Sequence, residues 1–329
     1  TPGRQGSSSK GPHTPLPLNT HRHTYPTTTP MATASTGAAR SIVVFGGTGL
    51  LGRRICQAAL ASGHTVTSVS GSGRPPAAIA TQPWVQQVQW AKGDVFKPHT
   101  YEHLLKDANT VVHSIGILLE NSNYKSVVRG DTGDGVLGVV SSLFSSNTRS
   151  NSNARDNANP MAKVPLNESH ESVDFVESAD VVDQTYANYN YKSALILADT
   201  LLEVKDPSTT PAFVYVSADR GFPGFLSGYI ESKRQAELEI SKMQPQLRPL
   251  ILRPGFMYDP EDNKTFRNTL KGVFGAAANV NKNLLGGTLD FLIKPAVATT
   301  QVANACMRKL DDESFKGIVS LEDMLKERS

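Results

Sequence analysis

The sequence predicts an α/β fold built on a doubly wound parallel sheet, with a small C-terminal lobe at about residues 260–329. Three observations predict this class. Short runs rich in β-branched residues, typical of buried parallel strands, recur along the chain. Segments with apolar residues at helical spacing separate most of these runs. The first run leads into a glycine-rich turn and then a helical pattern, and this order is typical of Rossmann-like folds.

The glycine-rich turn follows the first expected strand, residues 42–45, with Gly46, Gly49 and Gly52 spaced as G-x-x-G-x-x-G. The first glycine permits a tight turn, the second lets the backbone approach a pyrophosphate, and the third lets the helix pack closely on the strand. A helix N-terminus also attracts phosphate. A turn without ligand is the plain alternative, but the strand–turn–helix context favours a dinucleotide site. We expect it to be lined by Gly46, Gly47, Thr48, Gly49, Leu50, Leu51 and Gly52.

Length and composition exclude several functional classes. The chain has 329 residues, 39% of them hydrophobic, which is enough for a sizeable core, and no apolar run reaches the length of a membrane span. A net charge of +3 without a dense basic patch or aromatic platform argues against nucleic-acid binding. Outside the first 40 residues, no pair of histidines is accompanied by a cysteine pair at zinc-site spacing, so we predict no metal site. Cys56 and Cys306 are interpreted as reduced core residues.

Two segments are expected to lie outside a single domain at 41–329. Residues 1–40 are rich in Pro, Thr, Ser and His and contain no acidic residue, which predicts a disordered leader and suits an organelle transit segment. Its prolines argue against the usual amphipathic helix, and Met31 is an alternative start. Residues from about 121 to 180 are interpreted as an inserted, largely disordered surface loop, with a partner-binding segment as the alternative.

The remaining elements complete the expected sheet and its helices. The strands are expected at 64–69, 88–90, 110–114, 212–216, 250–252 and 317–320. Helices are expected from about Leu51 to a stop at Ser62-Gly63, after Pro98, at 184–204, from 229, at 265–274, at 300–310 and at the end of the chain.

The end of the second strand favours NADP over NAD. NAD-binding folds place an Asp or Glu there to bind the ribose 2′-hydroxyl, and this chain has none. Ser70 and Ser72 stand there instead, with Arg74 nearby. Arg53 and Arg54 occupy the first turn of the helix, where positive charge opposes the helix dipole, so a 2′-phosphate would explain them. A pair of solvated arginines is the alternative.

Further cofactor contacts are expected at the ends of the later strands, where ligands bind in open α/β sheets. The candidates are Asp94 and Val95 after the third strand, Ser114 and Gly116 after the fourth, and Pro254, Gly255 and Phe256 after the sixth. Asp94 either meets the adenine edge or caps the following helix.

Tyr229 and Lys233 are the candidate catalytic pair. They are four residues apart and therefore share one helical face. An ammonium near a phenol lowers the pKa of the phenol, so Tyr229 could exchange a proton with a carbonyl or alcohol during hydride transfer. Lys233 could also hold the ribose hydroxyls, and Ser217, at a strand end, could hydrogen-bond the substrate oxygen. A chance Tyr-x-x-x-Lys pair is the alternative, and Ser217 with the glycine turn weighs against it.

These motifs together resemble the short-chain dehydrogenase/reductase superfamily, in its extended and atypical branches. Residues 111–121, 217–223, 227–234 and 253–257 are similar to a fungal mitochondrial dehydrogenase-like family linked to coenzyme Q (ubiquinone) biosynthesis. That family is itself similar to the accessory 39-kilodalton subunit of respiratory complex I. The resemblance implies a mitochondrial location, in the matrix or peripheral on the inner membrane, and association with the ubiquinone-biosynthesis complex. Gly71 stands where the family has a basic residue, which weakens the NADP prediction unless Arg74 or Arg53 substitutes.

Three functions are compatible with the sequence. The first is an NADP-dependent oxidoreductase acting on a carbonyl, hydroxyl or quinone-type substrate, including a prenylated intermediate, with Tyr229 as acid or base. The second is a non-catalytic dinucleotide-binding scaffold or regulatory subunit of the ubiquinone-biosynthesis complex. The third is an epimerase or dehydratase that retains its nicotinamide.

Overall fold

The structure, a computed structural model, describes residues 38–117, 170, 182–219, 227–261 and 294–328. All of them belong to one compact unit, which spans residues 33–329. Its centre is a seven-stranded parallel sheet in the order β3-β2-β1-β4-β5-β6-β9. The strands are β1 (Ser41–Phe45), β2 (Thr65–Ser70), β3 (Gln89–Lys92), β4 (Thr110–His113), β5 (Ala212–Val216), β6 (Arg248–Leu252) and β9 (Gly317–Val319).

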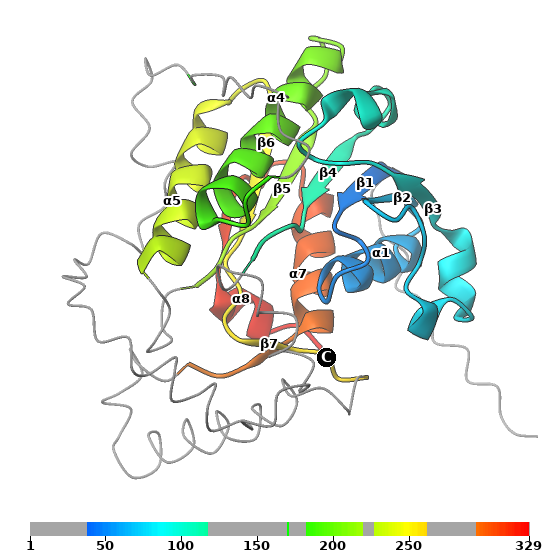
Figure 1. The fold of residues 1–329 in the computed structure, drawn as a ribbon. Coiled ribbons are helices and arrows are strands. Elements are labelled where there is room, and N and C mark those ends of the chain that lie inside the picture. Colours follow the sequence, from blue (N-terminus) through cyan, green and yellow to red (C-terminus); the bar gives the residue numbers. More distant parts are fainter. Residues whose placement is uncertain (1–37, 118–169, 171–181, 220–226, 262–293, 329) are drawn as a thin grey trace, which may run out of the picture. The chain divides into compact units, whose positions relative to one another are not determined.

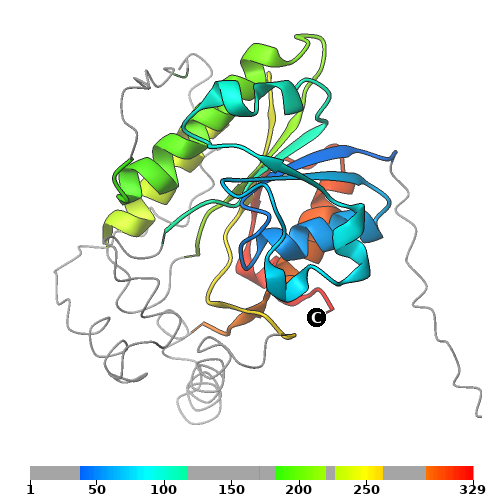
Figure 2. The same ribbon diagram turned by 45° about the vertical axis from the view of Figure 1, so that its right-hand side comes forward.

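Helices cover both faces of the sheet (Figures 1 and 2). One face is covered by α1 (Gly52–Ala61), α7 (Thr299–Asp311) and the short α8 (Leu321–Leu325). The other is covered by α4 (Ser193–Val204) and α5 (Ser227–Lys242), with a π-helix at Ala187–Lys192 leading into α4. Two short parallel strands, β7 (Met257–Tyr258) and β8 (Val297–Ala298), pair apart from the main sheet.

Alternating residues of the strands pack into two separate hydrophobic cores, one under each helix layer. In β1, Ile42 and Val44 pack toward α1 and α7, whereas Val43 and Phe45 pack toward α4 and α5. Because β1 is buried on both faces, its sequence is continuously apolar rather than alternating. The predicted class, a doubly wound parallel sheet, is confirmed by the strand order and by the two helix layers.

The crossover after β3 differs from the prediction. It contains 3-10 turns, at Pro98–Thr100 and Glu102–Leu104, rather than the helix expected after Pro98, and the crossover before β3 also contains 3-10 turns, at Ala77–Ile79 and Pro83–Gln87. Pro98 does begin a helical turn, but Tyr101 interrupts it with a φ of −142°. The Tyr101 hydroxyl donates to the Val95 carbonyl at 3.1 Å, so its buried ring is fixed by contacts other than those of a helix.

The C-terminal region also differs from the expected small lobe. Its described part, residues 294–328, joins the main unit, because β9 pairs in parallel with β6 and α7 packs against α1. This placement covers the apolar edge strand β6, whose Leu250 and Leu252 are fully buried. Three predicted segments lie wholly or mostly outside the described residues. They are the helix at 265–274, the leader at 1–40 (of which 1–37 are not described) and nearly all of the insertion at 121–180. Within the described part of the chain, every helix is too short or too polar to span a bilayer.

Candidate dinucleotide and catalytic site

The glycine turn between β1 and α1 leaves no room for side chains at two positions. Gly46 has a φ of +84°, and a β-carbon there would lie 2.7 Å from the Ser114 carbonyl oxygen. A β-carbon on Gly52 would overlap the Gly46 carbonyl. The tight turn at Gly46 and the close helix–strand packing at Gly52 are therefore as the sequence predicted.

The same turn fits a pyrophosphate. Gly49 is exposed, and its N–H is bonded to the Gly46 carbonyl at 2.9 Å, which holds the turn against the start of α1. The backbone N–H groups of Thr48 and Leu50 have no backbone acceptor among the residues that the structure describes. The first turn of α1 carries no acidic side chain. Free donors at a helix N-terminus without nearby carboxylates form a suitable cradle for phosphate.

Arg53 and Arg54, at the start of α1, share the buried carboxylate of Asp259. Arg53 approaches it at 2.5 Å and Arg54 at 2.6 Å. Burial disfavours charge on Asp259 and Arg54, but their hydrogen bonds outweigh it, lowering the pKa of Asp259 and raising that of Arg54. Arg54 also bonds Gln57 and the exposed Glu261. The sequence predicts both arginines as ligands of a 2′-phosphate but gives no sign of Asp259, which no local pattern links to α1.

The loop after β2 brings Ser70, Ser72 and Arg74 together at the carboxyl edge of the sheet. The two serine hydroxyls lie 3.3 Å apart, and each accepts a backbone N–H of the loop, from Gly73 and Arg74 respectively. The Arg74 side chain is exposed. A Rossmann-like fold binds the adenosine ribose beside the end of this strand.

Asp94 and Val95 follow β3. The Asp94 carboxylate accepts the N–H of Phe96 at 3.1 Å, so it caps its own turn, which is one of the two roles expected for it. Val95 is buried in the core beneath α4, with its carbonyl bonded to Tyr101. Its side chain therefore belongs to the core, and its backbone is the part that lies at the sheet edge.

The segment after β4 passes close to α5. Ser114 donates its N–H to the Phe45 carbonyl at 2.9 Å. A β-carbon at the exposed Gly116 would lie 2.9 Å from Asn190 Oδ1 and 3.1 Å from Lys233 Nζ, so a larger residue would collide with the candidate catalytic lysine.

Asn190 is a site residue that the sequence analysis missed. Its amide is fully buried, accepts the Ile117 N–H at 3.0 Å and donates to the Ile117 carbonyl at 3.2 Å. It lies in the π-helix at Ala187–Lys192, a distortion that is frequent at functional sites. In the sequence, Asn190 stands out only as a polar residue beside an apolar helical segment. Its partner Ile117 is 73 residues away, so the sequence does not reveal their contact.

Lys233 is almost fully buried, at 3% exposure, although its side chain carries an ammonium. Its Nζ donates to the Val216 carbonyl at 2.8 Å and lies 4.8 Å from the centre of the Tyr215 ring. Burial lowers the pKa of Lys233 to about 7, with the Glu237 carboxylate acting in the opposite direction. Burying a lysine ammonium weakens the fold. A buried lysine with a pKa near 7 is therefore characteristic of functional sites, where its chemistry is needed.

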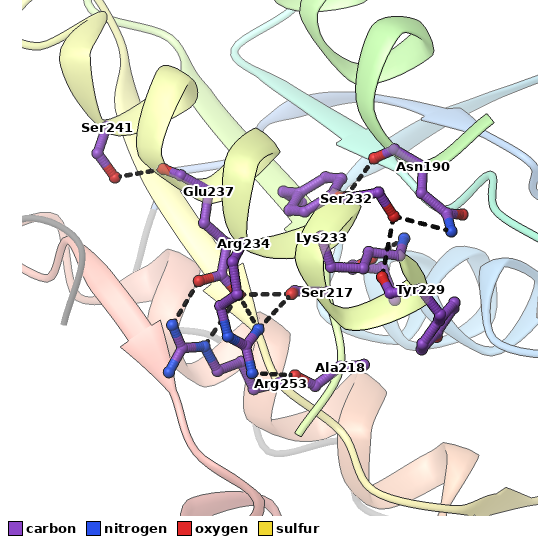
Figure 3. Close-up of polar contacts among 12 residues, drawn as sticks. Asn190, Ser217, Ala218, Tyr229, Ser232, Lys233, Arg234, Glu237, Ser241 and Arg253 are labelled. Atoms are coloured by element: carbon purple, nitrogen blue, oxygen red, sulfur yellow. Dashed lines mark hydrogen bonds and ion pairs between the residues drawn. The ribbon is translucent and has the colours of Figure 1, made fainter. Parts of the chain in front are cut away.

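Tyr229 lies one turn before Lys233 on α5 and is half-buried. Its ring meets that of the buried Tyr186 edge to face, with centroids 5.8 Å apart. Figure 3 shows Tyr229, Lys233 and Asn190 grouped on one side of α5. The structure therefore brings the predicted pair to the same side as Gly116, near the carboxyl ends of β4 and β5.

Ser217, directly after β5, belongs to a second group in Figure 3. Its hydroxyl donates to the Glu237 carboxylate at 2.5 Å and accepts from Arg234 at 3.2 Å. Glu237 is fully buried and also pairs with Arg234, at 2.7 Å, and with Arg253 through two hydrogen bonds. The sequence analysis expected Ser217 to face substrate and did not anticipate Glu237, whose partners come from three separate elements.

The Arg-Pro-Gly turn after β6 is held from both sides. The Pro254 carbonyl accepts the N–H of Asp219 at 2.8 Å, and that of Phe256 accepts the N–H of Val297 at 2.9 Å. A β-carbon on the half-buried Gly255 would lie 3.1 Å from the Leu321 side chain. The turn is thus fixed beside the end of β5, where a nicotinamide pocket was predicted.

His113 and the cysteines are buried groups without a catalytic arrangement. The Ser193 hydroxyl donates to the Tyr189 carbonyl, so His113 Nε2 must donate to Ser193, at 2.8 Å. Burial lowers the pKa of His113 to about 3, which keeps it neutral. Cys56 and Cys306 are free thiols whose pKa burial raises to about 12. No His, Cys, Asp or Glu cluster suited to a metal occurs among the described residues.

Replacing Lys233 with methionine is expected to stabilise the fold below neutral pH. The folded pKa, about 7, lies below the ordinary value of 10.5, so between these values the unfolded wild-type chain binds a proton that the folded chain does not. Between these two pKa values, the free energy of unfolding of the wild type therefore rises with pH relative to that of the variant. After loss of the bond to Val216, we expect a net gain of about 2–4 kcal/mol at pH 6 that disappears toward pH 10.

The measurement is urea unfolding at pH 6, 7.5 and 9.5, with Lys316→Met as the exposed control. A difference between Lys233→Met and wild type that does not change with pH would contradict the low pKa of Lys233.

The fold and the glycine turn define a dinucleotide-binding α/β protein, and comparison with known proteins gives its class. Residues 42–151 match the NAD dependent epimerase/dehydratase family, within the short-chain dehydrogenase/reductase superfamily, and the chain belongs to this family. It is 39% identical over 302 residues to MIOREX complex component 2 of Saccharomyces cerevisiae, covering 87% of this chain and 98% of the yeast protein. It is 25% identical over 294 residues to an uncharacterized chloroplastic protein of Arabidopsis thaliana, At1g32220, covering 86% and 75%.

Solved structures with the same type of fold are more distant. A putative epimerase from Burkholderia cenocepacia is 16% identical, with a TM-score of 0.48, covering 88% of this chain and 79% of its own. WbmG of Bordetella bronchiseptica, solved in complex with NAD, is 12% identical, with a TM-score of 0.48, covering 87% and 73%.

Proposed function

We propose that this chain is an NADP-dependent oxidoreductase of ubiquinone biosynthesis, acting on a carbonyl or hydroxyl group of a quinone-type or prenylated ring compound. The observation that carries the proposal is Lys233, a buried lysine one helical turn from Tyr229 and in contact range of Gly116. A buried cation with a lowered pKa is costly for stability, and a catalytic role beside Tyr229 accounts for its presence.

The chain's own residues support an acid–base role in this reaction. A nicotinamide bound along the carboxyl edge of the sheet supplies hydride exchange. The phenol of Tyr229 exchanges a proton with the substrate oxygen, and the Lys233 ammonium favours the phenolate. Asn190 holds the backbone at Ile117, next to Gly116. The Ser217 hydroxyl donates to Glu237 in this structure, and it would turn away from that carboxylate to donate a hydrogen bond to the substrate oxygen.

The biological setting is proposed from resemblance and composition. The motifs at 217–223 and 227–234 resemble those of the family linked to ubiquinone biosynthesis, and the acid-free residues 1–40 suit a mitochondrial transit segment. We therefore place the chain in mitochondria, in the matrix or peripheral on the inner membrane, with the ubiquinone-biosynthesis complex as partner. A yeast relative that is named as a complex component supports membership of a multiprotein assembly.

A second candidate is a dinucleotide-binding subunit without catalysis, in which the bound cofactor only stabilises the fold. The name of the yeast relative favours it, since that name describes a component and no reaction. An epimerase or dehydratase that retains its nicotinamide is the third, and the description of the matched family favours that option.

The first test removes the hydroxyl group of Tyr229 and measures the loss of turnover. With NADPH and decylubiquinone as the probe, Tyr229→Phe is expected to lower kcat about 100-fold or more, because general acid–base catalysis contributes this much. NADPH binding, followed by its fluorescence, should be unchanged. Tyr191→Phe, a half-buried tyrosine on the helical segment before α4, is the matched control and should retain activity.

Equal turnover in Tyr229→Phe and wild type would remove Tyr229 from the mechanism. Complementation separates the oxidoreductase from the non-catalytic subunit. If a strain lacking the relative recovers its ubiquinone level with Tyr229→Phe/Lys233→Ala as well as with wild type, the chain acts as a subunit and not as a catalyst.

A further inference from the structure

Arg234 connects α5 to the segment that follows β5 (Figure 3). It is the residue after Lys233, and its guanidinium reaches back to the end of the strand. The Nη1 of Arg234 donates to the Ser217 hydroxyl oxygen at 3.2 Å, and its Nη2 donates to the Ala218 carbonyl at 2.9 Å. Arg234 therefore holds Ser217 at two points, through its hydroxyl and through the carbonyl of the next residue.

The Glu237 carboxylate receives hydrogen bonds from one neutral and two charged side chains. Its Oε1 accepts from Ser217 at 2.5 Å, from Arg234 at 2.7 Å and from Arg253 at 2.9 Å. Its Oε2 accepts a further bond from Arg253. Bonds between a guanidinium and a carboxylate are strong because both partners are charged. The two arginines can therefore satisfy Glu237 without the serine.

This arrangement lets the Ser217 hydroxyl leave Glu237 at a low cost in free energy. Glu237 is fully buried, and a buried carboxylate that loses its donors is strongly destabilising. When the Ser217 proton turns toward a substrate oxygen, Oε1 keeps its bonds from Arg234 and Arg253. Without Arg234, the serine hydroxyl would supply a larger share of the stabilisation of Glu237 and would be held to it more strongly.

Arg234 also acts on the oxygen of Ser217. The bond from Nη1 fixes this oxygen at the end of β5, whereas the hydroxyl proton can rotate about the Cβ–Oγ bond. A hydroxyl that accepts a hydrogen bond from a cation is a better donor, because hydrogen bonds in a chain polarise one another. Both effects favour donation by Ser217 to a ligand at the carboxyl ends of the strands.

We propose that Arg234 is a positioning residue, which holds the Ser217 oxygen and frees its proton from Glu237 for the substrate oxygen. The inference rests on the proposed function in that Ser217 donates to the substrate. Arg234 acts through Ser217 and does not itself contact the reacting atoms. The contrasting interpretation is an ion pair between Arg234 and Glu237, three residues apart on α5, that only supports the fold. The two interpretations differ in whether the effect of Arg234 on turnover requires the Ser217 hydroxyl.

A double-mutant cycle on the purified full chain makes this distinction. Turnover of NADPH with decylubiquinone is measured for wild type, Arg234→Met, Ser217→Ala and the double variant. Ser217→Ala should lower kcat about 100-fold, because it removes a donor to the substrate oxygen. Arg234→Met, which keeps the apolar stem, should lower kcat about 10- to 30-fold. In the Ser217→Ala background, Arg234→Met should change kcat less than about 3-fold, because the hydroxyl on which it acts is gone.

Three controls separate positioning from a general loss of structure. Arg234→Lys keeps a cation beside Glu237 and should recover part of the kcat lost in Arg234→Met. Gln235→Met changes an exposed neighbour on α5 and should turn over NADPH as wild type does. NADPH fluorescence should give the same affinity for all variants. Thermal unfolding checks that each variant is folded at the assay temperature, and if Arg234→Met is not, Arg234→Lys in both backgrounds completes the cycle.

The outcomes distinguish this inference from the proposed function. A wild-type kcat in Arg234→Met overturns the positioning role, and so do equal losses from Arg234→Met in the wild-type and Ser217→Ala backgrounds. Turnover that depends on Arg234 through Ser217 but survives Tyr229→Phe overturns the assignment of Tyr229 and leaves the role of Arg234 standing. Absence of turnover in wild type overturns the proposed function and this inference together.

Discussion

Replacing Glu237 with glutamine is expected to lower the free energy of unfolding by about 3–5 kcal/mol, because this is the usual cost of breaking a buried ion pair by removing one partner. Glu237 is fully buried and receives hydrogen bonds from Ser217, Arg234 and Arg253. Glutamine keeps the shape but removes the charge, so the buried guanidinium of Arg253 loses its closest counter-charge.

Urea unfolding of wild type and Glu237→Gln at pH 7.5 measures the effect. Glu231→Gln, an exposed position on the same helix, is the matched control and should lie within about 0.5 kcal/mol of wild type. The double variant Glu237→Met/Arg253→Met should recover much of the lost stability, because it removes both charges. Similar unfolding free energies for Glu237→Gln and Glu231→Gln would show that the cluster does not support the fold.

Replacing Gly52 with valine is expected to abolish dinucleotide binding and to cost about 3 kcal/mol of stability, since overpacking against a fixed neighbour has costs of this size. The new β-carbon would overlap the Gly46 carbonyl, which is backbone and cannot turn aside as a side chain could. The start of α1 would have to move away from β1. That movement would open the turn which positions the N–H groups of Thr48 and Leu50 for a phosphate.

NADPH fluorescence and thermal unfolding report the two effects separately. Gly71→Ala is the control, because a β-carbon at Gly71 meets nothing within 4 Å and the residue has no positive φ. The control should bind NADPH as wild type does. Binding by Gly52→Val within about 3-fold of wild type would mean that the glycine turn is not the phosphate site.

The fold was predictable where local pattern and burial coincide. The buried, β-branched or apolar runs of β1, β4 and β5 lie in the middle of the sheet, so their composition alone identified them. The 3-10 turns after Pro98 were not predictable, because apolar spacing over three or four residues does not distinguish a 3-10 turn from an α-helix. The strand at Gly317–Val319 was predicted, but its pairing with β6 was not, since three residues carry no sign of their neighbour.

In the candidate site, too, the local features were predictable and the contacts between separate elements were not. The glycine positions and the spacing of Tyr229 and Lys233 are local, and their relative placement followed from the rule that ligands bind at strand ends. Asp259, Glu237 and Asn190 were missed because each acquires its place through contacts between separate elements. Ser217 illustrates the difference, since its position at the end of β5 was predicted whereas its bond to Glu237 depends on the packing of α5.

The packing of α7 on α1 has a consequence for the order in which this protein forms. The helix that begins at Gly52 is covered by the helix at Thr299–Asp311, so its buried face has no permanent cover until that later segment has been synthesised. Contacts between such distant segments form late, because a long loop must close first. The glycine turn and α1 are thus encoded well before the helix that covers them, and an emerging chain would expose apolar α1 surface of the kind that chaperones bind.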